Sequence, residues 1–112
     1  MRQYEIWWAD LPGPIGRRPV LLLSRDAAFG YLTRVIVVEV TTVVRNIPVE
    51  VPLGRAEGLP RRSVANFDNL HVVPRARLSA RIGFVGASRV GELKRALGSA
   101  LGWQELKEIQ PE

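Results

Sequence analysis

The stretch Pro19-Val20-Leu21-Leu22-Leu23-Ser24 is a continuous apolar run between turn-forming residues, and Arg34 to Thr41 (RVIVVEVT) repeats its character. Short runs rich in valine, isoleucine and leucine are typical of strands that are buried on both faces of a sheet. We therefore expect these two segments to be the core strands of the protein.

Shorter patterns around these runs predict the rest of a mostly β domain. Tyr4 to Asp10 is aromatic and alternating, with Ile6 and Trp8 on one face of a strand and Trp7 on the other. The other expected elements are a loop over Leu11 to Gly16, a helical turn over Asp26 to Gly30, strands at Val49 to Leu53, Ser63 to Phe67 and Leu70 to Val73, and an exposed connection from Gly54 to Arg62.

A C-terminal helix is predicted to close this domain. It begins near Ser88, which is a good N-cap residue, and its apolar positions recur at a spacing of about 3.6 residues. The apolar positions are Val90, Leu93, Leu97 and Leu101, while Arg89, Lys94 and Arg95 are expected to face water. The tail after Trp103 is expected to fray.

Composition and charge limit the classes of function. The net charge is +5, and 14 of the 16 basic residues are arginines, whose planar guanidinium suits phosphate contacts. This charge favours a nucleic-acid partner, although an arginine-rich composition alone does not require one. The chain has no run near the ~20 apolar residues of a membrane span and no signal-peptide pattern, so we expect a cytoplasmic protein without membrane contact. Without cysteine, thiolate chemistry is excluded.

Several mechanisms of phosphodiester cleavage lack the residues that they need. The acidic residues stand singly along the chain, so neither a metal site nor another cofactor is expected. The single histidine, His71, cannot supply a two-histidine acid–base pair, and we interpret it as structural or exposed, with a catalytic role as the alternative. The serines lack the glycine pattern of a nucleophile elbow.

Attack by an RNA 2′-hydroxyl on its neighbouring phosphate remains feasible, because it needs only hydrogen-bond donors at the developing charge and routes for two protons. Arg17 and Arg18 stand where a Gly-Pro loop enters the first core strand, a placement that favours phosphate contact. From the residues alone, a surface ion pair explains Arg18 at least as well, and ordinary strand preference explains Thr41.

Four blocks stand in a recognisable order along nearly the whole chain. They are Glu5 to Leu11 (EIWWADL), Arg17 to Asp26 (RRPVLLLSRD), Val40 to Val51 (VTTVVRNIPVEV) and Ser63 to Leu70 (SVANFDNL), the last followed by Val73 to Leu78 and Ile82-Gly83. Together they resemble the MazF/PemK family of toxin endoribonucleases. Any one block would be a weak signal, but their order and spacing make the match specific.

The resemblance implies an α+β, mostly β fold: one toxin domain over residues 1–112, built as a small SH3-like β-barrel of the MazF/CcdB type with a C-terminal helix. It also implies a homodimer that holds single-stranded RNA at its interface and cleaves it without a metal, leaving a 2′,3′-cyclic phosphate and a 5′-hydroxyl. The family's catalytic pair falls on Arg18 and Thr41. Arg18 would bind the scissile phosphate and take part in proton transfer, and Thr41 would stabilise the phosphorane.

Further RNA contacts follow from the resemblance. Asn69 falls where similar proteins place a side chain that reads a base, and Arg17, Ser24 and Arg45 are expected to contact the RNA backbone or bases. Alternatively, Arg45 pairs with Glu50 and Asn69 caps the turn before the next strand segment.

The loop from Pro12 to Arg17 is shorter than in many members of the family, where a longer loop gates the groove. A shorter loop removes base contacts. We therefore expect either a less selective target or recognition by the connection from Gly54 to Arg62.

The family also implies a partner, an acidic MazE-like antitoxin that blocks the basic groove and links the complex to promoter DNA. The alternatives are a non-catalytic toxin, such as a CcdB-like gyrase inhibitor, and a catalytically silent RNA-binding module. The chain ends Glu105 to Glu112 (ELKEIQPE), which does not resemble the Trp-Gly-Ile ending of the gyrase-binding toxins.

Overall fold

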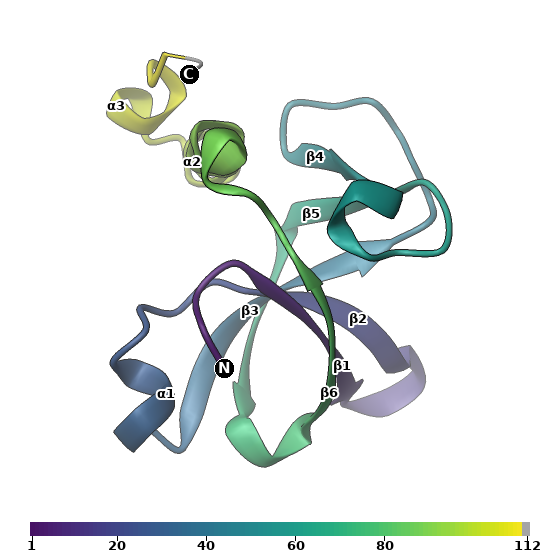
Figure 1. Ribbon diagram of the computed structural model, residues 1–112. Coiled ribbons are helices and arrows are strands. Elements are labelled where there is room, and N and C mark those ends of the chain that lie inside the picture. The colour runs from purple at the N-terminus through teal and green to yellow at the C-terminus, as the bar shows by residue number, and fades with distance from the viewer. Residues whose placement is uncertain (111–112) are drawn as a thin grey trace.

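The computed structural model of the protein describes residues 1–110. Six antiparallel strands form one sheet in the order β4-β5-β3-β2-β1-β6. Figure 1 shows that this sheet is strongly curved, with the short helix α1 (Ala28–Tyr31) at one end and the helices α2 (Val90–Leu101) and α3 (Gln104–Lys107) at the other. The strands are β1 (Glu5–Leu11), β2 (Gly16–Leu22), β3 (Arg34–Thr41), β4 (Glu50–Leu53), β5 (Ser63–Pro74) and β6 (Leu78–Phe84).

Apolar side chains pack on both faces of the sheet. On one face, Leu21 and Val38 belong to a cluster that includes Leu93 of α2, and on the other face Val20 and Leu22 pack with Phe29 of α1. Val20, Leu21 and Leu22 are fully buried. The prediction of core strands covered on both faces is therefore confirmed, and the mostly β class with C-terminal helices is confirmed as well.

The first core strand begins earlier than its apolar run. β2 starts at Gly16 and ends at Leu22, because it pairs with β1 from Leu11↔Gly16 onward. The predicted loop over Leu11 to Gly16 therefore shrinks to a tight hairpin connection that contains the 3₁₀ turn η1 (Gly13–Ile15). Gly16 has φ +69°, a left-handed conformation that favours glycine.

The two strand segments predicted after Arg62 belong to one strand. β5 pairs with β3 along its length, but the register jumps between Val38↔Leu70 and Glu39↔Asn66. Phe67 turns into the core within this bulge, while Asp68 and Asn69 are exposed. A bulge of this kind kinks the strand and changes where its side chains point.

The sequence does not predict the strand β6. Only Leu78 and Gly83 in its sequence LSARIGF are buried, because β6 is an edge strand that pairs with β1 alone. The 3₁₀ turn η3 (Arg75–Arg77) connects it to β5.

The connection from Gly54 to Arg62 is exposed only in part. It contains the 3₁₀ turn η2 (Arg55–Glu57), and the side chains of Glu57 and Leu59 are buried. A Cβ atom at Gly83 would lie 2.0 Å from the carbonyl oxygen of Glu57, so η2 and β6 are in direct backbone contact. The segment therefore covers part of the sheet, which local sequence without periodicity does not reveal.

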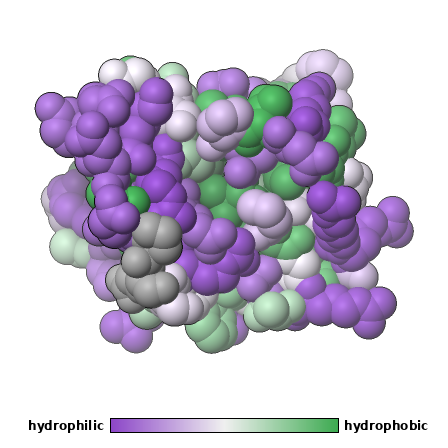
Figure 2. Space-filling view, turned by 90° about the horizontal axis from the view of Figure 1, so that it is seen from above, coloured by the Kyte–Doolittle hydropathy of each residue, from purple (hydrophilic) through white to green (hydrophobic). Residues whose placement is uncertain are grey.

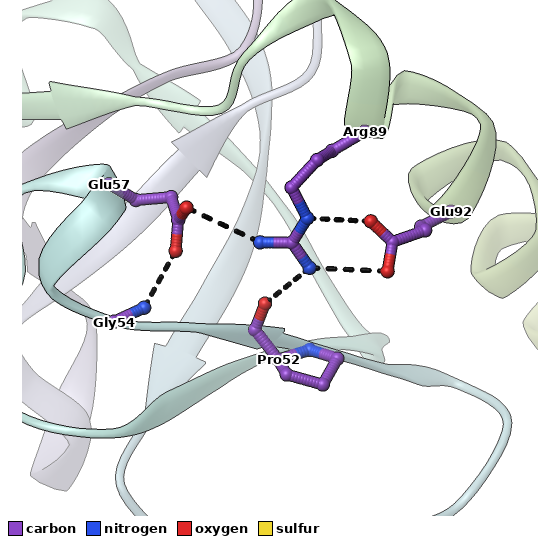
Figure 3. Close-up of polar contacts among 5 residues, drawn as sticks. All are labelled: Pro52, Gly54, Glu57, Arg89 and Glu92. Atoms are coloured by element: carbon purple, nitrogen blue, oxygen red, sulfur yellow. Dashed lines mark hydrogen bonds and ion pairs between the residues drawn. The ribbon is translucent and has the colours of Figure 1, made fainter. Parts of the chain in front are cut away.

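The C-terminal helix forms as predicted, but two expectations about its start are wrong. Ser88 lies in the 3₁₀ turn η4 (Ala87–Arg89), and no side chain caps α2, which begins at Val90. Arg89 does not simply face water. Its Nε donates to Glu92 at 2.6 Å, its Nη2 donates to the carbonyl oxygen of Pro52 at 2.7 Å, and its Nη1 lies 3.4 Å from Oε2 of Glu57 (Figure 3). The hydrogen bond to Glu92 raises the pKa of Arg89 above its usual value.

The tail through Gln110 is ordered rather than frayed. α3 folds back on α2 so closely that a Cβ atom at Gly98 would lie 2.7 Å from Cβ of Leu106. Pro111 and Glu112, which the prediction also covered, lie outside the described residues. Figure 2 shows the end of the molecule that carries these helices, where hydrophilic side chains surround a broken strip of hydrophobic ones. No helix in residues 1–110 is long and apolar enough to cross a membrane.

Candidate active site

A proline separates the two core strands at one end. β2 and β3 pair through Leu22↔Val37, Leu21↔Val38 and Val20↔Glu39, and the ladder stops there. The next residue of β2 is Pro19, which has no N–H to donate to a neighbouring strand. Continuing the register would set Arg18 opposite Thr41, on the sheet face that Glu39 occupies, because side chains alternate along a strand.

The space between the separated strands is a pocket that contains both members of the predicted catalytic pair. Arg18 enters it from β2, and Thr41 enters it from the end of β3. The full lining is Arg17, Arg18, Pro19, Val40, Thr41, Thr42, Val43 and Ser63. Two residues that are 23 positions apart in the sequence are therefore brought to one small surface site.

Arg18 is held by a buried carboxylate. Its Nη1 donates to Oε1 of Glu39 at 2.9 Å, and the other oxygen, Oε2, lies 3.1 Å from Nε2 of His71. Only 11% of the Glu39 side chain is exposed, against 34% for that of Arg18. The ion pair expected as the alternative for Arg18 thus exists, but its acidic partner is buried. Because an ionised carboxylate only accepts, this contact is a hydrogen bond when Nε2 of His71 carries a proton.

The hydroxyl of Thr41 is fixed by the chain that follows it. Oγ1 accepts a hydrogen bond of 3.2 Å from the backbone N–H of Val43. This contact uses a lone pair and leaves the hydroxyl proton free to donate. Thr41 can therefore present a donor toward the pocket, as stabilisation of a charged phosphorus centre requires.

Arg17 lies on the opposite face of β2 from Arg18. Its guanidinium stacks on the indole ring of Trp8, with Cζ 4.6 Å from the ring centroid. Trp8 lines a second pocket together with Arg61 and Arg81, and this pocket shares Pro19, Thr42 and Ser63 with the first. The two pockets form a connected surface that combines cationic and aromatic side chains, the groups that hold single-stranded nucleic acids.

The other predicted RNA contacts are not in this pocket. Ser24 is buried just beyond the other end of β2, where its Oγ accepts a hydrogen bond from the N–H of Ile36. Asn69 is exposed on the β5 bulge, two residues before His71. The side chain of Arg45 is exposed, and its backbone N–H donates to Oε1 of Glu50 at 2.9 Å. The alternative Arg45–Glu50 contact is thus made by the backbone, and the roles of Ser24, Arg45 and Asn69 in RNA binding stay predictions.

Glu39 is the site residue that sequence reasoning missed. In the sequence Glu39 stands as one of several isolated acidic residues, and the pattern favours a structural or exposed His71 over a catalytic one. The available signal was a single carboxylate among the apolar residues Val35 to Val40 of a core strand. Within residues 1–110 no three acidic or histidine side chains gather as metal ligands would.

Comparison with known proteins shows the family of the chain. Residues 2–101 match the family described as PemK-like, MazF-like toxins of type II toxin–antitoxin systems. The chain belongs to this family. It is 40% identical over 98 residues to the probable endoribonuclease MazF5 of Mycobacterium tuberculosis, a match that covers 87% of this chain and 89% of that protein.

Solved structures of MazF-like toxins share the fold. The Mycobacterium tuberculosis toxin MazF-mt6 superposes with a TM-score of 0.83 at 37% identity, and the match covers 88% of this chain and 96% of that one. An endoribonuclease in complex with its cognate antitoxin, from a mycobacterial species, gives a TM-score of 0.81 at 28% identity, with coverage of 92% and 96%. The MazF-like fold therefore extends over most of this chain.

Proposed function

We propose that this protein is a metal-independent endoribonuclease that cleaves single-stranded RNA and thereby acts as the toxin of a type II toxin–antitoxin pair. The observation that carries the proposal is the meeting of Arg18 and Thr41 in one pocket between the separated ends of β2 and β3. Membership of the MazF-like family and the endoribonuclease names of its relatives support the same activity.

The proposed reaction uses Arg18 and Thr41, which both line the pocket. The 2′-oxygen of a nucleotide attacks the adjacent phosphorus and passes its proton to water, the bond from phosphorus to the 5′-oxygen breaks, and that oxygen takes up a proton from water. Arg18 donates to the scissile phosphate and takes part in proton transfer, although a guanidinium is a poor base, and the Thr41 hydroxyl donates to the phosphorane. The products are a 2′,3′-cyclic phosphate and a 5′-hydroxyl.

RNA binding is proposed to extend from this pocket across the connected surface. Arg17 on Trp8 offers a charged and aromatic platform for a nucleotide, and Arg61 and Arg81 also line the second pocket. Ser24, Arg45 and Asn69 remain candidate contacts that lie outside the two pockets.

We propose a homodimer that works in the cytoplasm and is held inactive by an acidic MazE-like antitoxin, which also provides any contact with promoter DNA. The net charge of +5 suits an acidic partner. Support comes from relatives: one mycobacterial endoribonuclease was solved with its cognate antitoxin, and MazE–MazF complexes are known from Deinococcus radiodurans. A single toxin domain over residues 1–112 remains part of the proposal.

The test is cleavage of a mixed single-stranded RNA by antitoxin-free protein in EDTA, with mapping of the new ends. Wild type should leave 5′-hydroxyl ends, whereas Arg18→Ala and Thr41→Val should cut at least about 100-fold more slowly. Arg25→Ala and Thr33→Val are matched controls at exposed positions, Arg25 beyond the other end of β2 and Thr33 just before β3, and should cut like wild type. Folded wild type that binds RNA without cutting it would favour an RNA-binding module, and one that inhibits gyrase instead would favour the CcdB-like alternative.

A further inference from the structure

Glu39 is a carboxylate where the fold itself calls for an apolar side chain. Its neighbours in β3, Val37, Val38 and Val40, are all buried, and Glu39 is 8% exposed in the same central strand. Moving a carboxylate out of water costs several kcal/mol, and an apolar residue at such a position is often equally or more stabilising. The fold alone therefore does not explain the charge.

Both oxygens of this carboxylate have defined partners. Oε1 accepts from Nη1 of Arg18 at 2.9 Å, and Oε2 lies 3.1 Å from Nε2 of His71. The strand register explains the arrangement. His71 pairs with Val37 and Val20 pairs with Glu39, so one face of the sheet carries His71, Glu39 and Arg18 side by side across three strands.

Arg18 depends on Glu39 for its orientation. It follows Arg17 at the point where the β2–β3 ladder has ended, and Glu39 is the one side-chain or backbone partner that its guanidinium has within residues 1–110. This contact uses Nη1 and leaves Nε and Nη2 to face a phosphate, since a guanidinium carries five donors in a fixed fork.

We infer that Glu39 is the positioning residue that aims Arg18 into the pocket, and that His71 holds Glu39 in turn. The inference rests on the proposed role of Arg18 in RNA cleavage. Glu39 is buried and acts through the guanidinium that it holds. A misplacement of about 1 Å in such a group can slow a reaction about 100-fold.

This arrangement has a kinetic signature that a merely structural residue would lack. The Glu39 carboxylate also repels a phosphate bound at Arg18. Removal of the carboxylate charge therefore strengthens the attraction between Arg18 and the phosphate, but it leaves the orientation of the guanidinium less well fixed. A Glu39→Gln protein should therefore bind RNA as tightly as wild type, or more tightly, and yet cleave it more slowly.

The experiment compares wild type, Glu39→Gln, Arg18→Lys and the double variant in single-turnover cleavage and in binding of an RNA with a 2′-deoxy nucleotide at the cleavage site. We expect Glu39→Gln to lower the cleavage rate about 10- to 100-fold without weakening binding. In the Arg18→Lys background it should add less than about twofold, because residues that act as a unit are not additive. An unchanged cleavage rate in Glu39→Gln, or losses that multiply in the double variant, would overturn the inference.

A second pair of variants tests whether His71 holds Glu39, and it leaves the buried carboxylate unchanged. His71→Gln keeps a donor toward Glu39 and should cleave within about threefold of wild type, whereas His71→Leu removes the donor and should lose about tenfold. If both variants match wild type, His71 does not hold Glu39. This pair also serves if Glu39→Gln does not fold.

A direct readout keeps this inference separate from the proposed function. Rotation about the Cζ–Nη bonds of Arg18, followed by ¹⁵N NMR without RNA, should be slow in wild type and fast in His71→Leu and Glu39→Gln. If wild type does not cleave RNA, the proposed function fails, and slow Arg18 rotation that depends on Glu39 would still support the positioning. Fast rotation in wild type would overturn it.

Discussion

A Cβ atom on Gly83 would lie 2.0 Å from the carbonyl oxygen of Glu57, so only glycine lets β6 meet the turn η2 at this point. Gly83→Ala must push the two backbones apart, and we expect it to lower the free energy of unfolding by roughly 1–3 kcal/mol. Urea denaturation measures this change. Gly86→Ala is the matched control, because a Cβ there meets nothing within 4 Å. Equal urea midpoints for Gly83→Ala and Gly86→Ala would show that the contact between Gly83 and Glu57 does not exclude a Cβ atom.

Arg89 connects the start of α2 to Pro52 in β4 and to Glu57 in η2. Its removal should destabilise the protein through the buried carboxylate of Glu57. Only 7% of the Glu57 side chain is exposed, and Arg89→Ala leaves it without its cation. We expect a loss of roughly 1–3 kcal/mol in the free energy of unfolding, because an unsatisfied buried charged group is costly. Lys94→Ala, on the exposed side of α2, should change stability by less than about 0.5 kcal/mol. A similar small effect of both variants in chemical denaturation would contradict the prediction.

Glu5 should make stability depend on pH. Burial alone would raise its pKa, but hydrogen bonds from the Trp7 indole, the Arg2 backbone and Arg81 outweigh it and lower the pKa below the usual value. A lowered carboxyl pKa contributes stability that is present above the unfolded value of about 4.3 and is lost as the pH falls through the folded value. Glu5→Gln should therefore destabilise the protein at pH 7, and the difference from wild type should shrink below about pH 4.

Thermal unfolding between pH 7 and pH 3 measures this effect. Glu105→Gln on the exposed surface of α3 is the control, and it should follow wild type throughout. A Glu5→Gln deficit that stays constant over this range would show that the charge of Glu5 is not responsible.

Arg17 is predicted to contribute to RNA binding rather than to the chemical step. Its guanidinium lies over Trp8 beside the pocket, so Arg17→Ala should raise the dissociation constant for RNA with little change in single-turnover rate at saturation. Loss of one phosphate contact should reduce the slope of log K against log salt concentration by about 0.7 for single-stranded RNA. Arg25, which stacks on Tyr31 beyond the other end of β2, provides the matched control. If Arg25→Ala lowers this slope as much as Arg17→Ala does, the effect comes from the net charge of the protein and not from a contact of Arg17 with RNA.

Local patterns in the sequence were sufficient for the central strands and the last helix. The runs around Val20 and Val37 and the helical spacing from Val90 to Leu97 bury enough apolar surface to select one local structure whatever lies around them. β6 has no such pattern, because an edge strand that buries two of its residues is selected by its partner β1. Its assignment depends on hydrogen bonds to a segment about 70 residues earlier.

In the candidate site, too, some features follow from local sequence and others depend on the tertiary structure. The sequence by itself, through its resemblance to the MazF/PemK family, predicts Arg18 and Thr41 as the catalytic pair, and it can do so because residue type and motif order are local properties. The tertiary structure alone decided that Pro19 ends the ladder and opens a pocket between them, and that Glu39 and His71 stand behind Arg18. The physical reason is that strand register places side chains from distant parts of the chain on one face, and register is set by the packing of the whole sheet.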